Sequence, residues 1–367
     1  MDASAQKLPA TLLSWYDTHA RALPGRRAPG AALPADDPAW PYRVWLSEVM
    51  LQQTTTAAVK PYFAAFTKRW PTVMALAAAD EAEVMAAWAG LGYYARARNL
   101  IACARAVAAG GGMFPDTEAE LRKLPGLGAY TAAAVAAIAF GERAAVVDAN
   151  VERVIARVMA LEVPLPAARG AIRAAVDALT PADRPGDFAQ ALMDLGATIC
   201  TSRRPRCLLC PIAGACAGRL VDPERLPLKP PRKLRPVRAG RAFWIERDGN
   251  VWLVQRKASG MLGGMRALPD DRWSARGDGD GRAPLAGEWT AAGTVRHGFT
   301  HFELELQLLV YSGVYSGDDW ANLEANDGQW WPLARLAEAG LPTAFARAAL
   351  LATSLGDAAV EKIGDDL

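Results

Sequence analysis

The chain has 367 residues, of which 51% are apolar and 22% charged, a composition that supports two or three domains with buried cores and excludes a disordered chain. The net charge of +2 would not by itself mark a nucleic-acid-binding protein, but residues 226–242 contain six basic and no acidic residues, whereas residues 243–367 contain 11 basic and 18 acidic ones. The N-terminal residues do not read as a secretory signal, and the weakly polar stretch at 129–140 is too short to cross a bilayer, so we expect a cytoplasmic protein without a membrane segment.

The first part of the chain is predicted to be helical. Up to about residue 220, apolar residues recur at helical spacing between short Gly and Pro interruptions. Helices are predicted over 42–59, 82–88 and 100–109, and Thr117 with Glu120 forms the capping-box pattern of another helix start. The proline density of residues 226–236 excludes a helix or a central strand and predicts an extended linker.

Beyond the linker the apolar period changes from 3.6 to 2. Asp248–Gly249 between apolar runs predicts a hairpin, residues 302–308 alternate as in a half-buried strand, and residues 341–354 predict a closing helix. The expected fold is therefore multidomain: an all-α domain at 1–225, a linker at 226–238, an α+β domain at 239–355 and a tail at 356–367.

Four of the five cysteines lie close together, which predicts a metal centre in a reducing compartment. Cys200, Cys207, Cys210 and Cys216 follow the spacing C-x6-C-x2-C-x5-C. Four thiolates in one loop suit zinc or an iron–sulfur cluster, and the spacing alone does not choose between them. The fifth, Cys103, lies on an apolar helix and is predicted to be a small core residue.

The segment Leu124–Gly128 joins two predicted helices. Gly126 and Gly128 permit a tight turn, and the free amides at the start of the second helix would bind an anion such as a backbone phosphate. An ordinary helix–helix turn is the alternative.

Two carboxylates are candidates for acid–base chemistry. Glu48 lies between Val44 and Leu51 on one helical face, where apolar surroundings would raise its pKa, although a solvated surface glutamate has the same pattern. Asp148 precedes a helical run, so a helix N-cap is the favoured interpretation on sequence alone. A protonated acid with an ionised carboxylate is the combination that cleaves glycosidic bonds.

Several segments together resemble the adenine DNA glycosylases of the MutY type, within the endonuclease III superfamily. The matching segments are residues 47–54, 90–94 and 147–151. The resemblance implies that Glu48 protonates adenine N7, that Asp148 stabilises or traps the deoxyribosyl cation, and that Asn150 hydrogen-bonds near Asp148. Ala149 stands where the family commonly has glycine.

The same resemblance implies functions for the cysteine loop and for the turn at Gly126–Gly128. The cysteine pattern resembles the family's [4Fe–4S] loop, and the Gly126–Gly128 turn resembles its helix-hairpin-helix element, which grips the DNA backbone. Tyr130 occupies the position at which strand-nicking relatives carry a Schiff-base lysine. Because a phenol cannot form an imine, we expect a monofunctional glycosylase.

The enzyme would have to flip adenine out of a duplex and fill or prop the gap that the base leaves. Gln53 and Tyr93 match family positions that wedge beside the opposite base. Leu91 would contact DNA or only pack at a helix end, and Arg96 and Arg98 suit phosphates.

The C-terminal part resembles the family's Nudix-like domain, without the metal-loading signature of Nudix hydrolases. Phe299, Thr300 and His301 resemble the loop that recognises 8-oxoguanine, with Thr300 in place of serine, and Gly263–Gly264–Met265 departs from the usual Gly-Gly-Leu-Trp. The expected partner is double-stranded DNA with A:8-oxoG or A:G mispairs, bound by a monomer. The alternatives are an endonuclease III-like enzyme for oxidised or mismatched pyrimidines and a non-enzymatic iron–sulfur DNA sensor.

Overall fold

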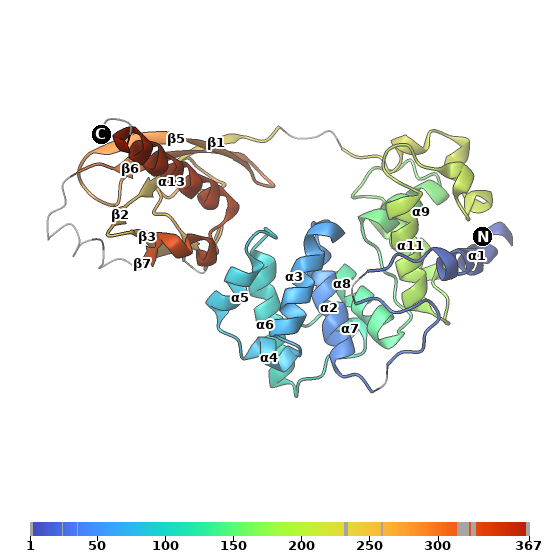
Figure 1. Cartoon of the computed structure of the whole chain (residues 1–367). Helices are drawn as coiled ribbons and strands as arrows, with labels where there is room; N and C mark the ends of the chain where they lie inside the picture. Colours follow the sequence, from blue (N-terminus) through green and yellow to red (C-terminus); the bar gives the residue numbers. More distant parts are fainter. Residues whose placement is uncertain are drawn as a thin grey trace. The chain divides into compact units, whose positions relative to one another are not determined.

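The computed structural model describes residues 3–23, 25–34, 36–230, 234–257, 260–313, 323 and 328–364, with residues 3–6 and 355–364 described by their backbone. The chain divides into two compact units (Figure 1). The first comprises Met1–Ala78 and Asn99–Arg232, and the second comprises Ala79–Arg98 and Lys233–Leu367. The segment Ala79–Arg98, which we predicted within the helical domain, thus belongs to the second unit.

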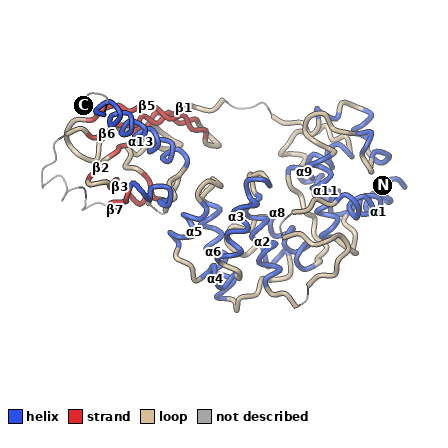
Figure 2. Tube along the Cα trace, viewed as in Figure 1, coloured by secondary structure: helices blue, strands red, loops and turns tan. Residues whose placement is uncertain are grey.

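The part of the chain before residue 226 is helical (Figure 2). Its α-helices are α1 (Ala3–His19), α2 (Ala39–Leu51), α3 (Thr56–Arg69), α4 (Val73–Ala77), α5 (Glu81–Trp88), α6 (Ala95–Ala109), α7 (Glu118–Leu121), α8 (Ala129–Val135), α9 (Ala149–Val158), α10 (Arg169–Leu179) and α11 (Pro185–Thr198). A π-helical turn, η1 (Ala136–Phe140), continues α8, and 3-10 turns follow α11 as η2 (Cys207–Leu209), η3 (Ala213–Ala215), η4 (Ala217–Leu220) and η5 (Pro223–Arg225).

The prediction of one helix over 42–59 is wrong, because the chain breaks between α2 and α3. Gln53 adopts a left-handed conformation with φ 55°. Thr55 then caps α3, its hydroxyl accepting a hydrogen bond from the Ala58 amide at 3.3 Å. A threonine cap inside an apolar pattern is a helix start that periodicity alone does not reveal.

The other predicted helices are confirmed with shifted ends. α5 begins one residue earlier than predicted, and α6 begins at Ala95 rather than near residue 100. Thr117 caps α7 by accepting a hydrogen bond from the Glu120 amide at 3.4 Å, although that helix ends at Leu121.

Two glycines bring the helices of the first unit unusually close together. A Cβ on Gly196 of α11 would lie 2.6 Å from the Cβ of Asn150 on α9. A Cβ on Gly186 would lie 2.5 Å from the carbonyl oxygen of Ala137 in η1. Real atoms do not approach so closely, so any other residue at either position would push α11 away from its neighbours.

The second unit contains two small sheets. One has the order β1 (Val237–Trp244), β6 (Glu303–Tyr311), β5 (Trp289–Gly298), with β1 parallel and β5 antiparallel to β6. The other joins β2 (Glu246–Arg247), β3 (Asn250–Gln255) and β4 (Arg266–Ala267), and β7 (Gly328–Pro332) also pairs with β3. A turn η6 (Leu333–Ala339) and the helix α13 (Thr343–Gly364) complete the unit.

The strand predictions are confirmed. Asp248 and Gly249 turn with φ 47° and 70°, and Glu246 pairs with Val251 across the hairpin. Along β6, Leu304, Leu306 and Leu308 are fully buried between more exposed neighbours and pack in one core with Phe345 of α13. The predicted closing helix continues past residue 354 to Gly364, through most of the segment predicted as a tail.

The predicted linker forms neither helix nor strand at the described residues 226–230 and 234–236, and β1 begins at Val237. The sequence between these stretches lies outside the described residues. Within the described ranges, no helix has the length and apolar character needed to cross a membrane.

Candidate active site

A pocket of about 580 Å³ in the first unit brings together the predicted catalytic residues. Glu48, Tyr130, Asp148 and Asn150 all line it, and they come from α2, α8 and the start of α9. The complete lining is Arg21, Leu23, Gly25, Arg26, Val44, Ser47, Glu48, Leu51, Thr54, Thr55, Thr56, Tyr130, Ile138, Asp148, Asn150, Gln190, Met193 and Ala197. Four residues separated by up to 102 positions in sequence thus share one cavity.

Glu48 is buried and bonded to Tyr130, which excludes the interpretation as a solvated surface residue. The residue is 8% exposed, and the Tyr130 hydroxyl donates to its Oε2 at 2.5 Å. Burial raises the pKa of Glu48, Asp148 raises it further, and the Tyr130 hydrogen bond and the Arg26 charge oppose the rise. A carboxyl with a raised pKa retains a proton closer to neutral pH, as a general acid requires.

An ion-paired arginine that the sequence analysis missed also lines the pocket. Arg26 donates to Oδ2 of Asp194 at 2.7 Å, and Arg21 donates to Oδ1 at 2.7 Å. Asp194 is completely buried on α11. The only sequence signal is a carboxylate within the apolar run Leu192–Leu195, which predicts a buried partner but does not say which one.

Substitution of Asp194 by asparagine is expected to lower the free energy of unfolding by about 2 kcal/mol, because two arginines lose their charged acceptor while an amide oxygen remains. Urea unfolding followed by circular dichroism measures this change. The control is Asp177→Asn, since the Asp177 side chain is 57% exposed, and we expect it to cost less than about 1 kcal/mol. Equal losses for the two variants would contradict the buried network.

Asp148 is both a helix cap and a wall of the pocket. Its Oδ1 accepts from the Val151 amide at 2.7 Å, so the N-cap prediction is confirmed. Its Oδ2 accepts from the Asn150 amide group at 2.7 Å, as the resemblance implied. Arg153 fixes that amide by donating to the Asn150 Oδ1 at 2.9 Å and, through Nε, to the Cys200 carbonyl at 2.8 Å. Oδ1 of Asp148 therefore caps α9, while Oδ2 is oriented by the Asn150 side chain.

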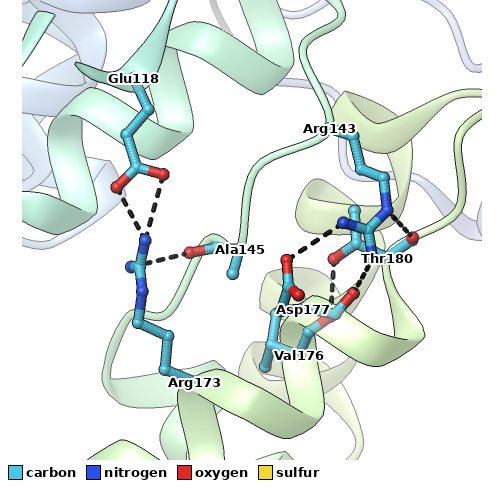
Figure 3. Close-up of polar contacts among 7 residues, drawn as sticks. All are labelled: Glu118, Arg143, Ala145, Arg173, Val176, Asp177 and Thr180. Carbon is cyan, nitrogen blue, oxygen red and sulfur yellow. Dashed lines mark hydrogen bonds and ion pairs between the residues drawn. The ribbon is translucent and has the colours of Figure 1, made fainter.

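The segment leading to the aspartate is clamped to α10 by two arginines (Figure 3). Arg143 reaches from this segment to the carboxylate and carbonyl of Asp177 near the end of α10. Arg173 reaches in the opposite direction, from α10 to the Ala145 carbonyl at 3.3 Å, and also pairs with a glutamate of α7 at 2.7 Å. These contacts hold the backbone that presents the aspartate to the pocket.

The predicted phosphate-binding turn lies between α7 and α8. Gly126 has φ 76°, and a Cβ there would lie 2.5 Å from the Asn99 Cβ, so only glycine fits. Gly128 is the N-cap of α8 and provides no side-chain cap. Both glycines are exposed, whereas Leu127 between them is buried and anchors the turn. The first amides of α8 thus lack a side-chain partner at an exposed helix start.

Each of the two predicted wedge residues is exposed and has a left-handed backbone. Gln53, between α2 and α3, has φ 55°, and Tyr93, between α5 and α6, has φ 50°. Left-handed conformations are rare for residues other than glycine and concentrate at functional sites. Leu91 is only 5% exposed, which favours packing at the helix end over the alternative of a DNA contact.

The four predicted cluster ligands line one small pocket after α11. Cys200, Cys207, Cys210 and Cys216 surround a space of about 30 Å³ together with Arg157. Arg157 is 1% exposed and donates to the Cys200 Sγ at 3.3 Å and to the Thr201 carbonyl at 2.7 Å. A buried cation at this position would offset the charge of thiolate ligands. Among the described residues, no three Cys, His, Asp or Glu side chains are grouped as ligands of a single metal ion.

The predicted 8-oxoguanine loop forms the tip of the β5–β6 hairpin. Thr300 and His301 are exposed there. Phe299 is half-buried and stacks on Phe302, with ring centroids 4.7 Å apart and planes within 14°. Phe299 thus fixes the tip to the core, while Thr300 and His301 are exposed to solvent.

Comparison with known proteins supports both halves of this description. Residues 46–168 match the HhH-GPD superfamily of base excision DNA repair proteins, and residues 241–350 match the NUDIX domain family. These matches confirm the predicted fold class. A solved thermostable thymine-DNA glycosylase aligns with TM-score 0.52 and 30% identity, covering 59% of this chain and 96% of that one.

Similar curated proteins extend over most of the chain. The adenine DNA glycosylase of Homo sapiens is 35% identical over 359 residues, which cover 81% of this chain and 65% of the human protein. The adenine DNA glycosylase of Rattus norvegicus is 35% identical over 393 residues, covering 91% of this chain and 75% of the rat protein. The chain therefore spans about two thirds to three quarters of the length of these relatives.

Proposed function

The chain belongs to the adenine DNA glycosylase family, hydrolases that act on N-glycosyl bonds in base excision repair, and on this premise we propose that it excises adenine paired with 8-oxoguanine or guanine. The observation that carries the proposal is the pocket in which a buried, tyrosine-bonded Glu48 and an oriented Asp148 occur together. A proton donor beside a second carboxyl group is the combination that cleavage of a glycosidic bond requires.

In the proposed reaction, Glu48 donates its proton to N7 of the flipped adenine. The glycosidic bond then breaks, and its electron pair leaves with the base. The ionised Asp148 stabilises the positive charge that develops on the sugar. Water adds to the sugar carbon and loses a proton, which leaves an abasic site in the intact strand.

The proposed enzyme is monofunctional. The pocket-lining residues include Tyr130 and no lysine among those the structure describes. Without an amine nucleophile there is no imine intermediate, so the strand is not nicked. Treatment with borohydride should therefore trap no covalent protein–DNA adduct.

Double-stranded DNA is the proposed partner. The uncapped start of α8 at Gly128 supports binding of a backbone phosphate, and the exposed Gln53 and Tyr93 support insertion beside the base opposite adenine. The exposed Thr300 and His301 would read 8-oxoguanine from the hairpin tip. A monomeric, cytoplasmic protein stays a prediction.

A [4Fe–4S] cluster is the proposed cofactor of the cysteine pocket. Four thiols share this pocket, and the resemblance of their spacing to the family's cluster loop supports a [4Fe–4S] cluster rather than zinc. The cluster would tie the coil after α11 to the buried Arg157, a structural contribution.

Substitution of Cys207 by serine is expected to reduce the iron content of the purified protein by more than half, because a hydroxyl is a much poorer ligand for a cluster than a thiolate. Iron analysis and the visible absorbance of the cluster measure the change. The matched control is Cys103→Ser, since Cys103 is a free cysteine buried in α6, away from the pocket. Zinc in the purified protein in place of iron would contradict the proposal.

The proposed function is tested by single-turnover incubation with duplexes that contain A:8-oxoG, A:G, T:G or thymine glycol. We expect abasic sites at adenine in the first two and none in the others. Release of thymine or thymine glycol would instead support an endonuclease III-like enzyme. Tight duplex binding without any excision would support a non-enzymatic sensor.

A further inference from the structure

The loop between α5 and α6 displays Tyr93 in a conformation that tyrosine rarely adopts. Tyr93 is 48% exposed, and its φ of 50° lies in the left-handed region. Such a conformation costs about 1–2 kcal/mol for a residue with a Cβ, so neighbouring contacts must stabilise it. Gly90 and Gly92, at φ 98° and 69°, let the chain turn on either side of the buried Leu91.

Arg96 supplies those contacts from the first turn of α6. Its guanidinium donates to the carbonyl oxygens of Leu91 at 3.1 Å and Gly92 at 3.4 Å. The guanidinium carbon also lies 5.3 Å from the ring centroid of Trp88 and 5.6 Å from that of Tyr93. The Trp88 Nε1 donates to the same Gly92 carbonyl at 3.1 Å. The cation is thus placed against two aromatic rings while it bonds the backbone beside the tyrosine.

Partial burial of Arg96 disfavours its charged form. Desolvation lowers the pKa of its guanidinium to about 10, although the group stays charged at neutral pH. An arginine that served only to attract phosphate would keep its charge in water. Here the structure folds Arg96 into the loop instead, against the expectation that it suits a phosphate.

We propose that Arg96 is a positioning residue that holds Tyr93 ready to insert into the duplex before DNA is bound. This inference rests on the proposed function, in which Tyr93 inserts beside the base opposite adenine. A tyrosine already fixed in the inserting orientation loses less conformational entropy on binding, so the stacking contact contributes more of its free energy to affinity. Arg96 therefore acts on DNA through Tyr93 and not through a phosphate.

A double-mutant cycle tests this coupling. Arg96→Met, Tyr93→Ala and the double variant are compared with the unsubstituted protein for their Kd toward an A:8-oxoG duplex whose adenine carries an excision-resistant 2′-fluoro sugar. We expect Arg96→Met to weaken binding about tenfold, and to have no further effect when Tyr93 is already alanine. Fluorescence of 2-aminopurine placed beside the 8-oxoguanine should fall in the same variants, because the base is no longer unstacked.

Two further readouts separate positioning from phosphate binding. A lost phosphate contact reduces the slope of log Kd against log salt by about one, whereas a positioning role leaves the slope unchanged. Arg96→Lys keeps the charge but not the planar stacking, so we expect it to bind as weakly as the methionine variant. Arg96→Lys also distinguishes positioning from phosphate binding if Arg96→Met does not fold. The matched control is Arg105→Met, the same substitution at an exposed position of the same helix.

The proposal is overturned if Arg96→Met weakens binding equally with and without Tyr93, if the salt slope falls, or if lysine restores full affinity. A protein that binds the duplex but excises no adenine contradicts only the proposed function. Absence of duplex binding by the unsubstituted chain contradicts both.

Discussion

Replacement of Glu48 by glutamine is expected to lower the single-turnover rate of adenine excision by on the order of 10³-fold, the typical contribution of a positioned general acid. Glutamine fills the same space and can accept the Tyr130 hydrogen bond, but it has no proton to give to the base. The rate is measured by the appearance of alkali-labile sites in an A:8-oxoG duplex with protein in excess. A variant that excises adenine at near the unsubstituted rate would exclude Glu48 as the acid.

The pH dependence of the unsubstituted protein gives a second measurement of the same group. Because burial raises the pKa of Glu48, its protonated fraction persists above the ordinary glutamate range and is lost as pH rises through the raised value. Excision should therefore decline on the alkaline side, and this decline should be missing from the residual activity of Glu48→Gln.

The free energy of unfolding of Glu48→Gln distinguishes loss of the general acid from damage to the fold. Removal of a buried carboxyl whose ionisation is disfavoured should leave the free energy of unfolding unchanged or raise it. Glu162→Gln, the same substitution at an exposed position, is the control for both rate and stability, and we expect it to change neither.

Asp148→Asn is expected to slow excision by about 10²–10³-fold, because the variant loses the negative charge that stabilises the sugar cation. The variant should nevertheless fold, since asparagine is as good an N-cap as aspartate and its Oδ1 can accept from the Val151 amide. The same single-turnover assay measures the rate, and urea unfolding checks the fold.

Asp80→Asn provides a matched control for this variant. Asp80 is also an N-cap, accepting from the Glu83 amide at 3.1 Å at the start of α5, and it does not line the pocket. If Asp148 were only a cap, the two substitutions would have the same small effect on excision. A large and selective loss for Asp148→Asn assigns the additional role to its charge.

Residue identity and local pattern could predict part of the site. Apolar neighbours mark Glu48, a following helical run marks Asp148, and spacing marks the cysteines, whereas the catalytic roles of the two carboxylates are implied by the family resemblance. The hairpin at Asp248–Gly249 could also be predicted from neighbouring residues, because its turn needs two residues with positive φ. In each case the signal lies within a few positions of the residue concerned.

The parts that could not be predicted depend on contacts between distant segments. Asp194 and its partner Arg26 are 168 positions apart, and no short pattern connects them. Leu91 and Arg96 lie in a short segment rich in plausible DNA contacts, but only the folded loop shows that one is buried and the other bonds the backbone. The break after α2 was missed because an exposed left-handed glutamine leaves no mark in the apolar period.

The π-helical turn at Ala136–Phe140 determines which changes of chain length the pocket can tolerate. A π turn accommodates one residue more than an α turn, so deletion of a single residue there would restore regular α geometry. Because the extra residue is accommodated within the turn, the deletion would move the residues of the turn itself relative to α11 and to the pocket. Ile138 would turn away from the cavity that it lines, and Ala137 away from the glycine that α11 presents to it. Point substitutions in this turn should be far better tolerated than deletions, a distinction that a library of one-residue deletions would reveal.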